Sequence, residues 1–276
     1  MATFSLHEKE NVSLYLNDLS LIDDVSSEIQ SVQLYNHPCL EKVLVINDEI
    51  QHVENWMPYY HEQLVHIPMM FIESPRKVLI LGGGDLFAAS EVLKYKSVTK
   101  LVLCDYDQNV INLTQKYYSH SNAVIKDPRF NLQIENAIDY IKNCKEKFDL
   151  IIDDCFNLVE AFESSYIFEQ IKSLLTPKGV CCSLVYRHIF DKITMNKTIT
   201  RLFNTQKTVL SLVTVPEYPG ILHLLSIWGN SPFLTQDLKR SVNSCHTESF
   251  NSACVLFNSN FCNFYMYLPP YVKMLL

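Results

Sequence analysis

Glycine is scarce in this chain. Only 6 of its 276 residues are glycine, whereas average usage would give about 19. Three of the six form Gly82-Gly83-Gly84, directly after the apolar run Val78-Leu79-Ile80-Leu81 and before Asp85. Such a run ending in glycines is typical of a buried strand that enters a tight turn before a helix. Because glycine permits left-handed torsions and close approach of a ligand to the backbone, we predict a ligand-binding loop here.

The patterns of metal sites are also lacking. The nine cysteines contain no Cys-x-x-Cys spacing, and His61 and His66 are five positions apart. A spacing of four would place the two imidazoles on one helical face. We therefore predict no metal site.

No basic segment followed by an apolar one opens the chain, so we expect a cytoplasmic protein with reduced thiols.

A concentrated basic patch is absent as well. The net charge is −7 and the basic residues are scattered, so we expect no nucleic-acid partner. Residues 249–272 carry no charge, but they contain four asparagines and the pair Pro269-Pro270. That composition makes a poor membrane span, so we expect no membrane partner. We interpret the stretch as a buried C-terminal strand and helix.

Hydrophobic periodicity predicts an α/β protein in three parts. Residues 1–75 are expected to form a small β-rich domain with one helix, residues 76–235 a mostly parallel sheet, and residues 236–276 a C-terminal extension packed on it. In the first part the strand candidates are 13–16, 29–34, 43–46 and 49–53, and the helix is 59–70. In the second part the strand candidates are 77–81, 100–104, 130–134, 148–152, 180–185, 209–215 and 222–228, the last two as an antiparallel hairpin, and the helices are 87–95, 109–117, 137–143 and 166–175.

Polar side chains follow several of the predicted strands, where ligands bind in open parallel sheets. Asp105 lies about 20 positions after the glycine loop, a position suited to hydrogen bonding with a ribose diol. Its alternative role is to cap the next helix, which we expect of Asp107 instead. Asn136 follows the third strand of the sheet. Its amide could contact an adenine edge or cap a helix, and the sequence leaves both open.

Two adjacent carboxylates, Asp153 and Asp154, follow the fourth strand of the parallel sheet. Because like charges repel, at least one of them should have a partner or a raised pKa. Asp153 could simply cap the next helix. For Asp154 we favour a role in chemistry.

In their order and spacing, these motifs resemble the spermidine and spermine synthase family, the polyamine aminopropyltransferases. The resemblance runs over most of the chain, and each motif alone is modest. The motifs are Leu44–Ile46, Ile50-Gln51, Tyr60-His61-Glu62, Val78–Asp85, Cys104–Asp107, Phe148–Asp154, Pro216-Glu217-Tyr218-Pro219 and Tyr267–Val272.

The resemblance implies a Rossmann-like sheet of the S-adenosylmethionine-methyltransferase type, a small N-terminal β domain and a homodimer. It also implies transfer of an aminopropyl group from decarboxylated S-adenosylmethionine, as co-substrate, to an amine acceptor such as putrescine. The product is 5′-methylthioadenosine, and no cofactor is permanently bound. The acceptor amine must lose a proton before it attacks the methylene beside the sulfonium. Asp154 stands where the family has its catalytic aspartate, so the resemblance makes it the general base.

The resemblance also assigns binding roles. The donor carries an ammonium without a carboxylate, so acids rather than basic residues should line its tail. The residues implied to bind the donor are Asp85 and His61 at the tail, Gly82, Gly83 and Gly84 in the loop, Gln51 at the nucleoside, Asp105 at the ribose and Asn136 at the adenine. Those implied to bind the acceptor or close over the substrate are Tyr60, Asp154, Asn157 and Tyr218.

The chain departs from the family pattern in both halves of the site. On the donor side, Leu86 replaces a glycine, Asp105 replaces a glutamate and Asn136 replaces an aspartate. On the acceptor side, Asn157 and Tyr186 replace the two acids expected to hold the far ammonium of a diamine. An unpaired ammonium in a buried site costs several kcal/mol. The donor half is therefore better preserved than the acceptor half.

Two alternatives follow from these departures. One is a relative that uses S-adenosylmethionine itself for methyl transfer or another alkylation, with Arg187 facing a carboxylate of a non-diamine acceptor. The other is a catalytically silent paralogue that binds the nucleoside beside an active subunit. The presence of Asp154 argues against the second.

Overall fold

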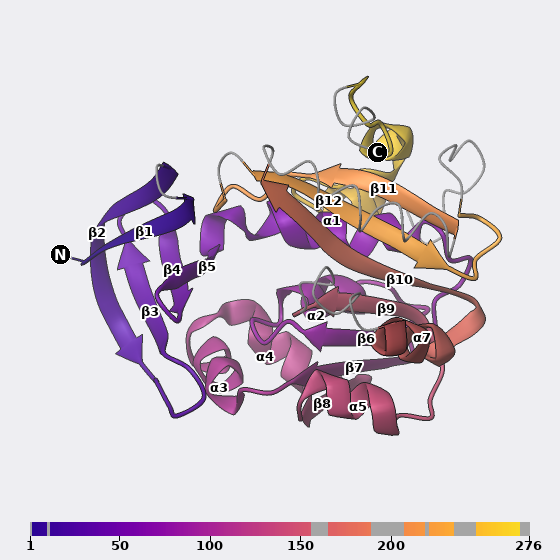
Figure 1. Cartoon of the computed structure of the whole chain (residues 1–276), viewed down its shortest axis with the longest axis horizontal. Coiled ribbons are helices and arrows are strands. Elements are labelled where there is room, and N and C mark those ends of the chain that lie inside the picture. The colour runs from indigo at the N-terminus through magenta and orange to yellow at the C-terminus, as the bar shows by residue number, and fades with distance from the viewer. Residues whose placement is uncertain are drawn as a thin grey trace.

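Two sheets organise the chain in this computed structural model (Figure 1). The structure describes residues 2–9, 12–155, 165–188, 207–218, 221–234 and 247–270. The N-terminal sheet is antiparallel, with its five strands in sequential order: β1 (Ala2–Lys9), β2 (Val12–Asp24), β3 (Val32–His37), β4 (Glu41–Ile46) and β5 (Glu49–Val53). The larger sheet has the order β11-β12-β10-β9-β6-β7-β8. Its strands are β6 (Lys77–Gly82), β7 (Lys100–Asp105), β8 (Phe130–Ile134), β9 (Phe148–Asp154), β10 (Leu175–His188), β11 (Lys207–Val213) and β12 (Ile221–Gly229).

Helices connect and cover these strands. Those of the first two thirds are η1 (Glu54–Trp56), α1 (Met57–Met69), α2 (Phe87–Leu93), α3 (Gln108–Tyr117), α4 (Ser119–Lys126), α5 (Ala137–Asn143) and α7 (Ser165–Leu174). Short helices follow in the C-terminal segment: α9 (Glu248–Ser252), η2 (Ser259–Phe261) and α10 (Cys262–Tyr265). Within the described ranges, no helix is long and apolar enough to cross a membrane.

Strand order places a topological switch point at the centre of the larger sheet. Strands β10, β9, β6, β7 and β8 run parallel, whereas β12 is antiparallel to β10 and β11 is antiparallel to β12. The chain proceeds from β6 to β7 and β8 on one side and then returns to β9 and β10 on the other. Ligands bind at the carboxyl ends of strands where the order reverses in this way. Gly82 pairs with Asp154 at that point.

Alternation of side chains along the buried strands gives the larger sheet two apolar faces. In β6, Val78 and Ile80 face one core, which α1, α2 and part of the C-terminal segment cover. Leu79 and Leu81 face the other core, which α5 and α7 cover. This two-sided burial explains why the parallel strands appear in the sequence as continuous apolar runs.

The N-terminal sheet stands beside the end of the larger sheet toward which β6 points (Figure 1). Apolar side chains of β3, β4 and α3 form one joint between the two sheets. Polar contacts add to it, because the Gln30 Nε2 donates to Asp107 Oδ2 at 2.7 Å and the Tyr106 hydroxyl donates to Gln30 Oε1 at 2.6 Å. The N-terminal sheet therefore forms a wall over the switch point.

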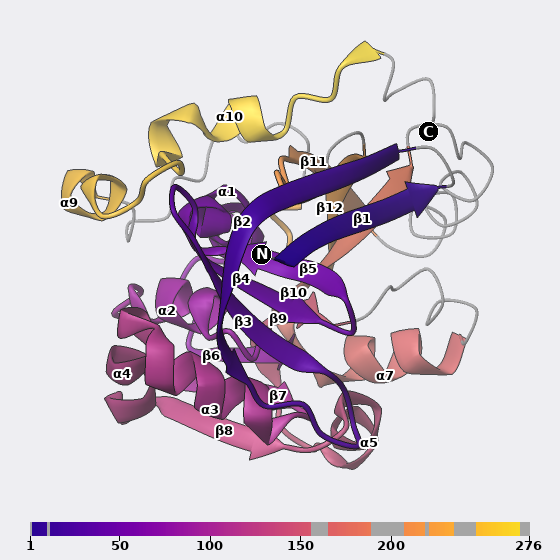
Figure 2. The ribbon, with the colours of Figure 1, turned by 90° about the vertical axis from the view of Figure 1, so that its left-hand side faces the viewer.

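The C-terminal segment is held by the buried carboxylate of Glu62 in α1. Its two oxygens accept the backbone N–H groups of Val255, Leu256 and Phe257 at 2.6, 2.7 and 2.7 Å. Figure 2 shows α9 and α10 running along one edge of the molecule past α1. Part of this segment is buried, including Phe250 and Phe257.

The predicted α/β class is confirmed, including the mostly parallel sheet, the antiparallel pair of β11 and β12, and the N-terminal β sheet. The expected C-terminal strand is wrong, because residues 247–270 form short helices and turns but no strand. The candidate over residues 29–34 begins late, at Val32. Strand β1 and helix α4 were not predicted.

The division of the chain at residues 75 and 235 stays a prediction. Helix α1 lies on the N-terminal side of the first boundary, yet Leu64, Val65 and Ile67 pack in the core of the larger sheet. The second boundary falls next to residues 235–246, outside the described residues.

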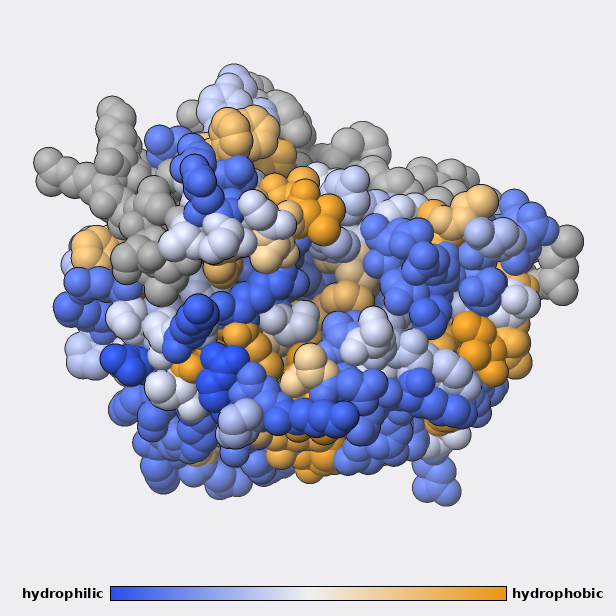
Figure 3. All heavy atoms as spheres, turned by 180° about the vertical axis from the view of Figure 1, so that it is seen from behind, coloured by the Kyte–Doolittle hydropathy of each residue, from blue (hydrophilic) through white to orange (hydrophobic). Residues whose placement is uncertain are grey.

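On the face seen in Figure 3, hydrophilic side chains cover most of the surface, with apolar ones in small groups.

Candidate active site

A cavity of about 330 Å³ lies at the carboxyl ends of β6, β7 and β9, under the wall formed by the N-terminal sheet. Its walls contain several acids and histidines but, among the described residues, neither lysine nor arginine. The lining residues are Gln30, Leu44, Ile46, Asn47, Glu49, Gln51, His52, Tyr60, His61, Gly82, Gly83, Gly84, Asp85, Asp105, Tyr106, Val110, Asp154 and Cys155. The cavity is therefore suited to a cationic ligand.

The glycine loop forms the floor of this cavity. Larger residues would not fit at two of its positions. Gly82 and Gly83 both have positive φ, at 82° and 76°. A Cβ atom on Gly82 would lie 2.5 Å from the Cβ atom of Cys155, and one on Gly84 would lie 2.8 Å from Asp105 Oδ2. Each glycine thus lets β6 lie close to a strand end that carries an acid.

Leu86 occupies a backbone conformation that glycine adopts more readily. It precedes α2 with a φ of 62°, in the left-handed region, and its side chain is buried in the core. A left-handed leucine costs about 1–2 kcal/mol. Burial of the side chain offsets that cost. The departure from the family's glycine therefore preserves the geometry of the turn.

Asp85 lies between two histidines at the start of α2. Its Oδ2 is 3.3 Å from His52 Nδ1 and 3.3 Å from His61 Nε2. Its Oδ1 accepts the backbone N–H of Phe87 at 2.9 Å. Burial alone would raise the pKa of Asp85, but His61 and His52 hold it well below the ordinary value. Asp85 is therefore ionised.

His61 carries the main positive charge of the cavity. Its Nδ1 lies 3.0 Å from the carbonyl oxygen of Met57, and its Nε2 faces Asp85. Both ring nitrogens face acceptors, which suits the imidazolium because only that form donates from both. Burial would lower the pKa of His61, but the Asp85 carboxylate outweighs it and raises the pKa to about 9.

Asp154 has the opposite environment. The Tyr60 hydroxyl donates to its Oδ1 at 2.7 Å, and burial, with Asp85 and Asp105 nearby, raises the pKa of its carboxyl to about 7. His61 and Tyr60 act in the other direction but do not cancel the effect of burial. A carboxyl with this pKa can hold or accept a proton near neutral pH.

Asp105 is the third acid of the cavity. Burial raises the pKa of its carboxyl, although backbone N–H groups of Asp107 and Gly84 donate to it and act in the other direction. Asp107 caps α3 by accepting the N–H of Asn109 at 2.8 Å, as predicted. Asp105 is therefore the acid at the end of β7 that lines the cavity.

The structure brings together most of the residues that the sequence analysis selected. Nine of them line one cavity: Gln51, Tyr60, His61, Gly82, Gly83, Gly84, Asp85, Asp105 and Asp154. Asn136 is outside the lining and caps α5, with its Oδ1 accepting the N–H of Ile138 at 2.9 Å. The Tyr218 hydroxyl donates to the carbonyl of Ile50 at 3.1 Å, also outside the lining. Asn157 lies outside the described residues.

Sequence reasoning missed His52 and Gln30. His52 follows Gln51 in β5 and contacts Asp85, and Gln30 links the N-terminal sheet to Asp107. Gln30 lies before β3 without any motif around it, so only the packing of the two sheets reveals it.

Comparisons with known proteins agree with this geometry. A family model described as the spermine/spermidine synthase domain matches residues 57–238. A polyamine aminopropyltransferase of Archaeoglobus fulgidus is 42% identical over 205 residues, which cover 74% of this chain and 76% of that protein. The crystal structure of spermidine synthase from Thermotoga maritima gives a TM-score of 0.82 at 27% identity and covers 96% of this chain and 90% of that one. A crystal structure of spermidine synthase in complex with the transition-state analogue AdoDATO gives a TM-score of 0.84 at 26% identity, covering 96% and 91%.

Replacing Asp154 by asparagine should stabilise the ligand-free protein at alkaline pH. The native state raises the pKa of this carboxyl from 3.8 to about 7, so the native state binds the proton more tightly than the unfolded state. The resulting stability is present below about pH 4 and is lost as the pH rises through about 7. Asp154→Asn should therefore unfold with a free energy roughly 2–4 kcal/mol higher than wild type near pH 8, and the gain should shrink toward pH 5.

Urea unfolding across this pH range measures the difference. Asp139→Asn, which removes an exposed carboxylate in α5, is the matched control and should show little change. A gain for Asp154→Asn that did not vary with pH would contradict the raised pKa.

Proposed function

The chain belongs to the spermine/spermidine synthase family, and we propose that it transfers the aminopropyl group of decarboxylated S-adenosylmethionine to an amine acceptor such as putrescine. The product on the donor side would be 5′-methylthioadenosine. The observation that carries the proposal is the acidic cavity without lysine or arginine among its described lining residues. The donor has a sulfonium and an ammonium but no carboxylate, so such a cavity attracts it.

The donor would lie along the ends of β6 and β7. Asp105, which lines the cavity, would accept hydrogen bonds from the ribose, and the glycine loop would permit the nucleoside to approach the backbone. Gln51 faces the same cavity from the N-terminal sheet. Asn136 uses its side-chain oxygen to cap α5, so its NH₂ group would have to contact the adenine.

The aminopropyl tail would extend toward Asp85 and Asp154. The nitrogen of the acceptor attacks the methylene beside the sulfonium, the carbon–sulfur bond breaks, and its electron pair neutralises the sulfur. Asp154 takes the proton that the acceptor nitrogen must lose. Tyr60 holds the carboxylate by its hydrogen bond to Oδ1. Tyr218, which packs against the core of the N-terminal sheet, would help to hold that sheet over the substrates.

The acceptor is the part of the reaction in which this chain should differ from its relatives. Asn157, outside the described residues, and Tyr186, whose backbone lies in β10, stand where two acids are expected. Glu160 and Glu163, the acids that could replace them, also lie outside the described residues. The motif acid Glu217 is not among the residues that line the cavity, and its Oε1 accepts the N–H of Val53 at 3.2 Å. We propose that the far end of the acceptor is held less strongly than in a site with two acids.

A product assay tests the proposed reaction. Purified protein with decarboxylated S-adenosylmethionine and putrescine should release 5′-methylthioadenosine, whereas intact S-adenosylmethionine should give no S-adenosylhomocysteine. Asp154→Asn should lower kcat by about 10²–10⁴-fold and weaken donor binding much less, because Asp85 still faces the donor ammonium. n-Butylamine lacks the second ammonium of putrescine. Because the far acids are replaced, kcat/KM for putrescine should exceed that for n-butylamine by only about tenfold.

The alternatives give different products in the same assay. Release of S-adenosylhomocysteine with an acceptor that carries a carboxylate would indicate the methyl- or alkyltransferase. Donor binding without any turnover would indicate the silent paralogue. Asp139→Asn should keep the wild-type rate, and full activity of Asp154→Asn would show that Asp154 is not the base.

Donor binding should release a proton from His61. The donor ammonium would compete with the imidazolium for Asp85, and a second cation there lowers the pKa of His61 from about 9. Near pH 8, calorimetry in buffers of different ionisation enthalpy should detect release of about half a proton or more with decarboxylated S-adenosylmethionine. Uncharged 5′-methylthioadenosine should release much less.

His61→Gln is the matched variant, because glutamine can hydrogen-bond to Asp85 but cannot carry the positive charge of an imidazolium. It should bind the donor with little proton release. Equal release from wild type and His61→Gln would mean that the donor does not contact the pair of Asp85 and His61.

We also propose that the chain acts as a homodimer in the cytoplasm. The C-terminal segment exposes large apolar side chains that a second copy could cover, among them Val255, Phe261 and Phe264. Light scattering after size-exclusion chromatography should give twice the mass of one chain, and Phe264→Glu should shift it toward the monomer. A wild-type monomer at micromolar concentration would exclude the dimer. Seven cysteines whose side chains the structure describes are free, which suits a reducing compartment, and cell fractionation checks that location.

A further inference from the structure

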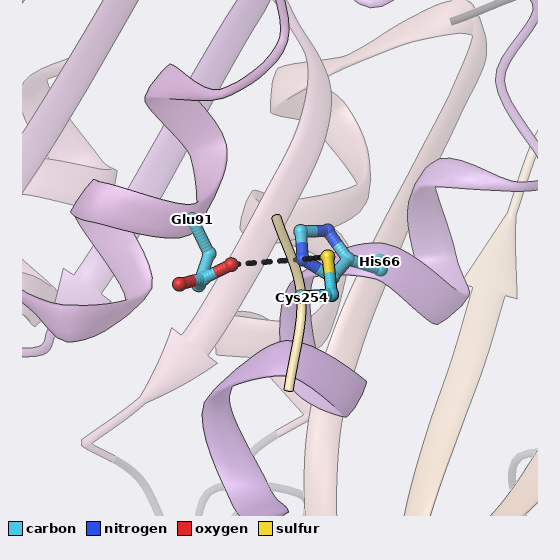
Figure 4. Close-up of side chains that lie close together, drawn as sticks. All are labelled: His66, Glu91 and Cys254. Carbon is cyan, nitrogen blue, oxygen red and sulfur yellow. Dashed lines mark hydrogen bonds and ion pairs between the residues drawn. The ribbon is translucent and has the colours of Figure 1, made fainter. Parts of the chain in front are cut away.

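Three side chains that bind metals in other proteins meet outside the cavity. Figure 4 shows His66 of α1, Glu91 of α2 and Cys254 of the C-terminal segment pointing toward one another. His66 Nε2 is 2.9 Å from Glu91 Oε2 and 3.6 Å from Cys254 Sγ. The three ligand atoms all lie within 4.8 Å of one another. The proposed transfer reaction uses none of them.

The spacing of these atoms is close to that of a tetrahedral zinc site. Zinc bonds of about 2.0–2.3 Å place neighbouring ligand atoms roughly 3.3–3.7 Å apart. The separation of His66 Nε2 from Cys254 Sγ is already in this range. Glu91 Oε2 is closer to Nε2 than this range, so it would have to move away from the imidazole by roughly 1 Å or less. Imidazole, carboxylate and thiolate are all ligands that zinc accepts.

We propose that His66, Glu91 and Cys254 bind a zinc ion, with a water molecule in the fourth position. Binding replaces the hydrogen bond that His66 Nε2–H donates to the Glu91 carboxylate by bonds from both atoms to the metal. The imidazole proton moves from Nε2 to Nδ1 by exchange with solvent, and the thiol proton of Cys254 passes to solvent. The charges of the carboxylate and the thiolate then balance the two charges of the ion.

The surroundings support binding by the imidazole. The ring of His66 is completely buried, and its Nδ1 is 3.1 Å from the hydroxyl of Tyr95. When Nδ1–H donates to that oxygen, Nε2 carries the lone pair that a metal needs. Rings of Phe250 and Phe257 pack against His66, with centroids 5.1 and 4.9 Å from its own. These contacts fix the direction in which Nε2 points.

Two charged groups border the site. Lys94 Nζ lies 2.5 Å from Glu91 Oε2 and 3.0 Å from the carbonyl oxygen of Ala253. The lysine side chain is 27% exposed, so it can move its ammonium into solvent when the ion takes that oxygen. Glu62 lies one helical turn before His66, and its oxygens accept the N–H groups of residues 255–257. It remains a backbone anchor beside the ion.

A zinc ion here would fasten the C-terminal segment to α1 and α2. Residues 250 and 257 already pack in the core of the larger sheet, and Cys254 lies between them. The ion would join three elements that are far apart in the sequence. Its predicted effect is therefore on stability and on the chemistry of Cys254.

Zinc binding is tested on the full-length protein. After incubation with zinc and desalting, wild type should retain about one zinc ion per chain, and a saturating concentration should raise the Tm by roughly 5 °C or more. Cobalt substitution should give the charge-transfer absorption of a cobalt–thiolate bond. Cys254→Ser and His66→Gln should lose the retained zinc and that absorption. Tyr95→Phe should bind zinc about 10–100-fold more weakly.

Two comparisons separate a zinc site from a purely structural cluster. Cys39→Ser changes an exposed cysteine in the N-terminal sheet region and should bind zinc as wild type does. In the wild-type protein, zinc should slow alkylation of Cys254 but not of Cys39, measured by mass spectrometry of the peptides. Retention of no more zinc by wild type than by Cys254→Ser, or alkylation of Cys254 that zinc does not slow, would overturn the proposal.

Discussion

Three partly buried carboxylates share one cavity, and burial together with the charge of His61 sets how their protons are distributed. Asp85, Asp105 and Asp154 end or follow strands that lie side by side, so no rearrangement of side chains can take them far apart. Asp85 has the nearest cation and stays ionised, whereas burial and the other acids raise the pKa of Asp154 to about 7. The same fold thus gives one carboxylate the properties of a fixed anion and another those of a base.

The backbone around the cavity follows from this crowding. Strands β6 and β9 pair up to Gly82 and Asp154, and a Cβ atom on Gly82 would collide with Cys155. A chain with few glycines uses three in succession here because the strand ends that carry the acids come so close. At Leu86, one position beyond Asp85, a leucine adopts the left-handed conformation while its side chain fills the core. The loop geometry is therefore compatible with leucine at position 86 as well as with the glycine of the family pattern.

Much of the site could be predicted from the sequence because its acids follow strands directly. An apolar run identifies a buried strand, and the parallel arrangement places the residues after each run at one edge, as with Asp105 and Asp154. Contacts between distant segments have no such signal. Nothing in the sequence links His52 to Asp85, or Cys254 to His66, until the sheets and helices pack. The C-terminal strand was wrong for a related reason, since the carboxylate of Glu62 satisfies the backbone N–H groups of residues 255–257 that strand pairing would otherwise use.

Under the proposed function, the raised pKa of Asp154 affects both the stability of the ligand-free protein and the activity of the donor-bound protein. In the free cavity a third anion beside Asp85 and Asp105 is unfavourable, and protonation of Asp154 near neutral pH relieves part of that repulsion. The donor brings a sulfonium and an ammonium into the same space, and both favour the ionised carboxylate. Tyr60 already donates to Asp154 Oδ1, so ionisation needs no movement of the side chain. Donor binding therefore ionises Asp154, the proposed base, and protonation of Asp154 in the free cavity avoids the full cost of a third partly buried charge.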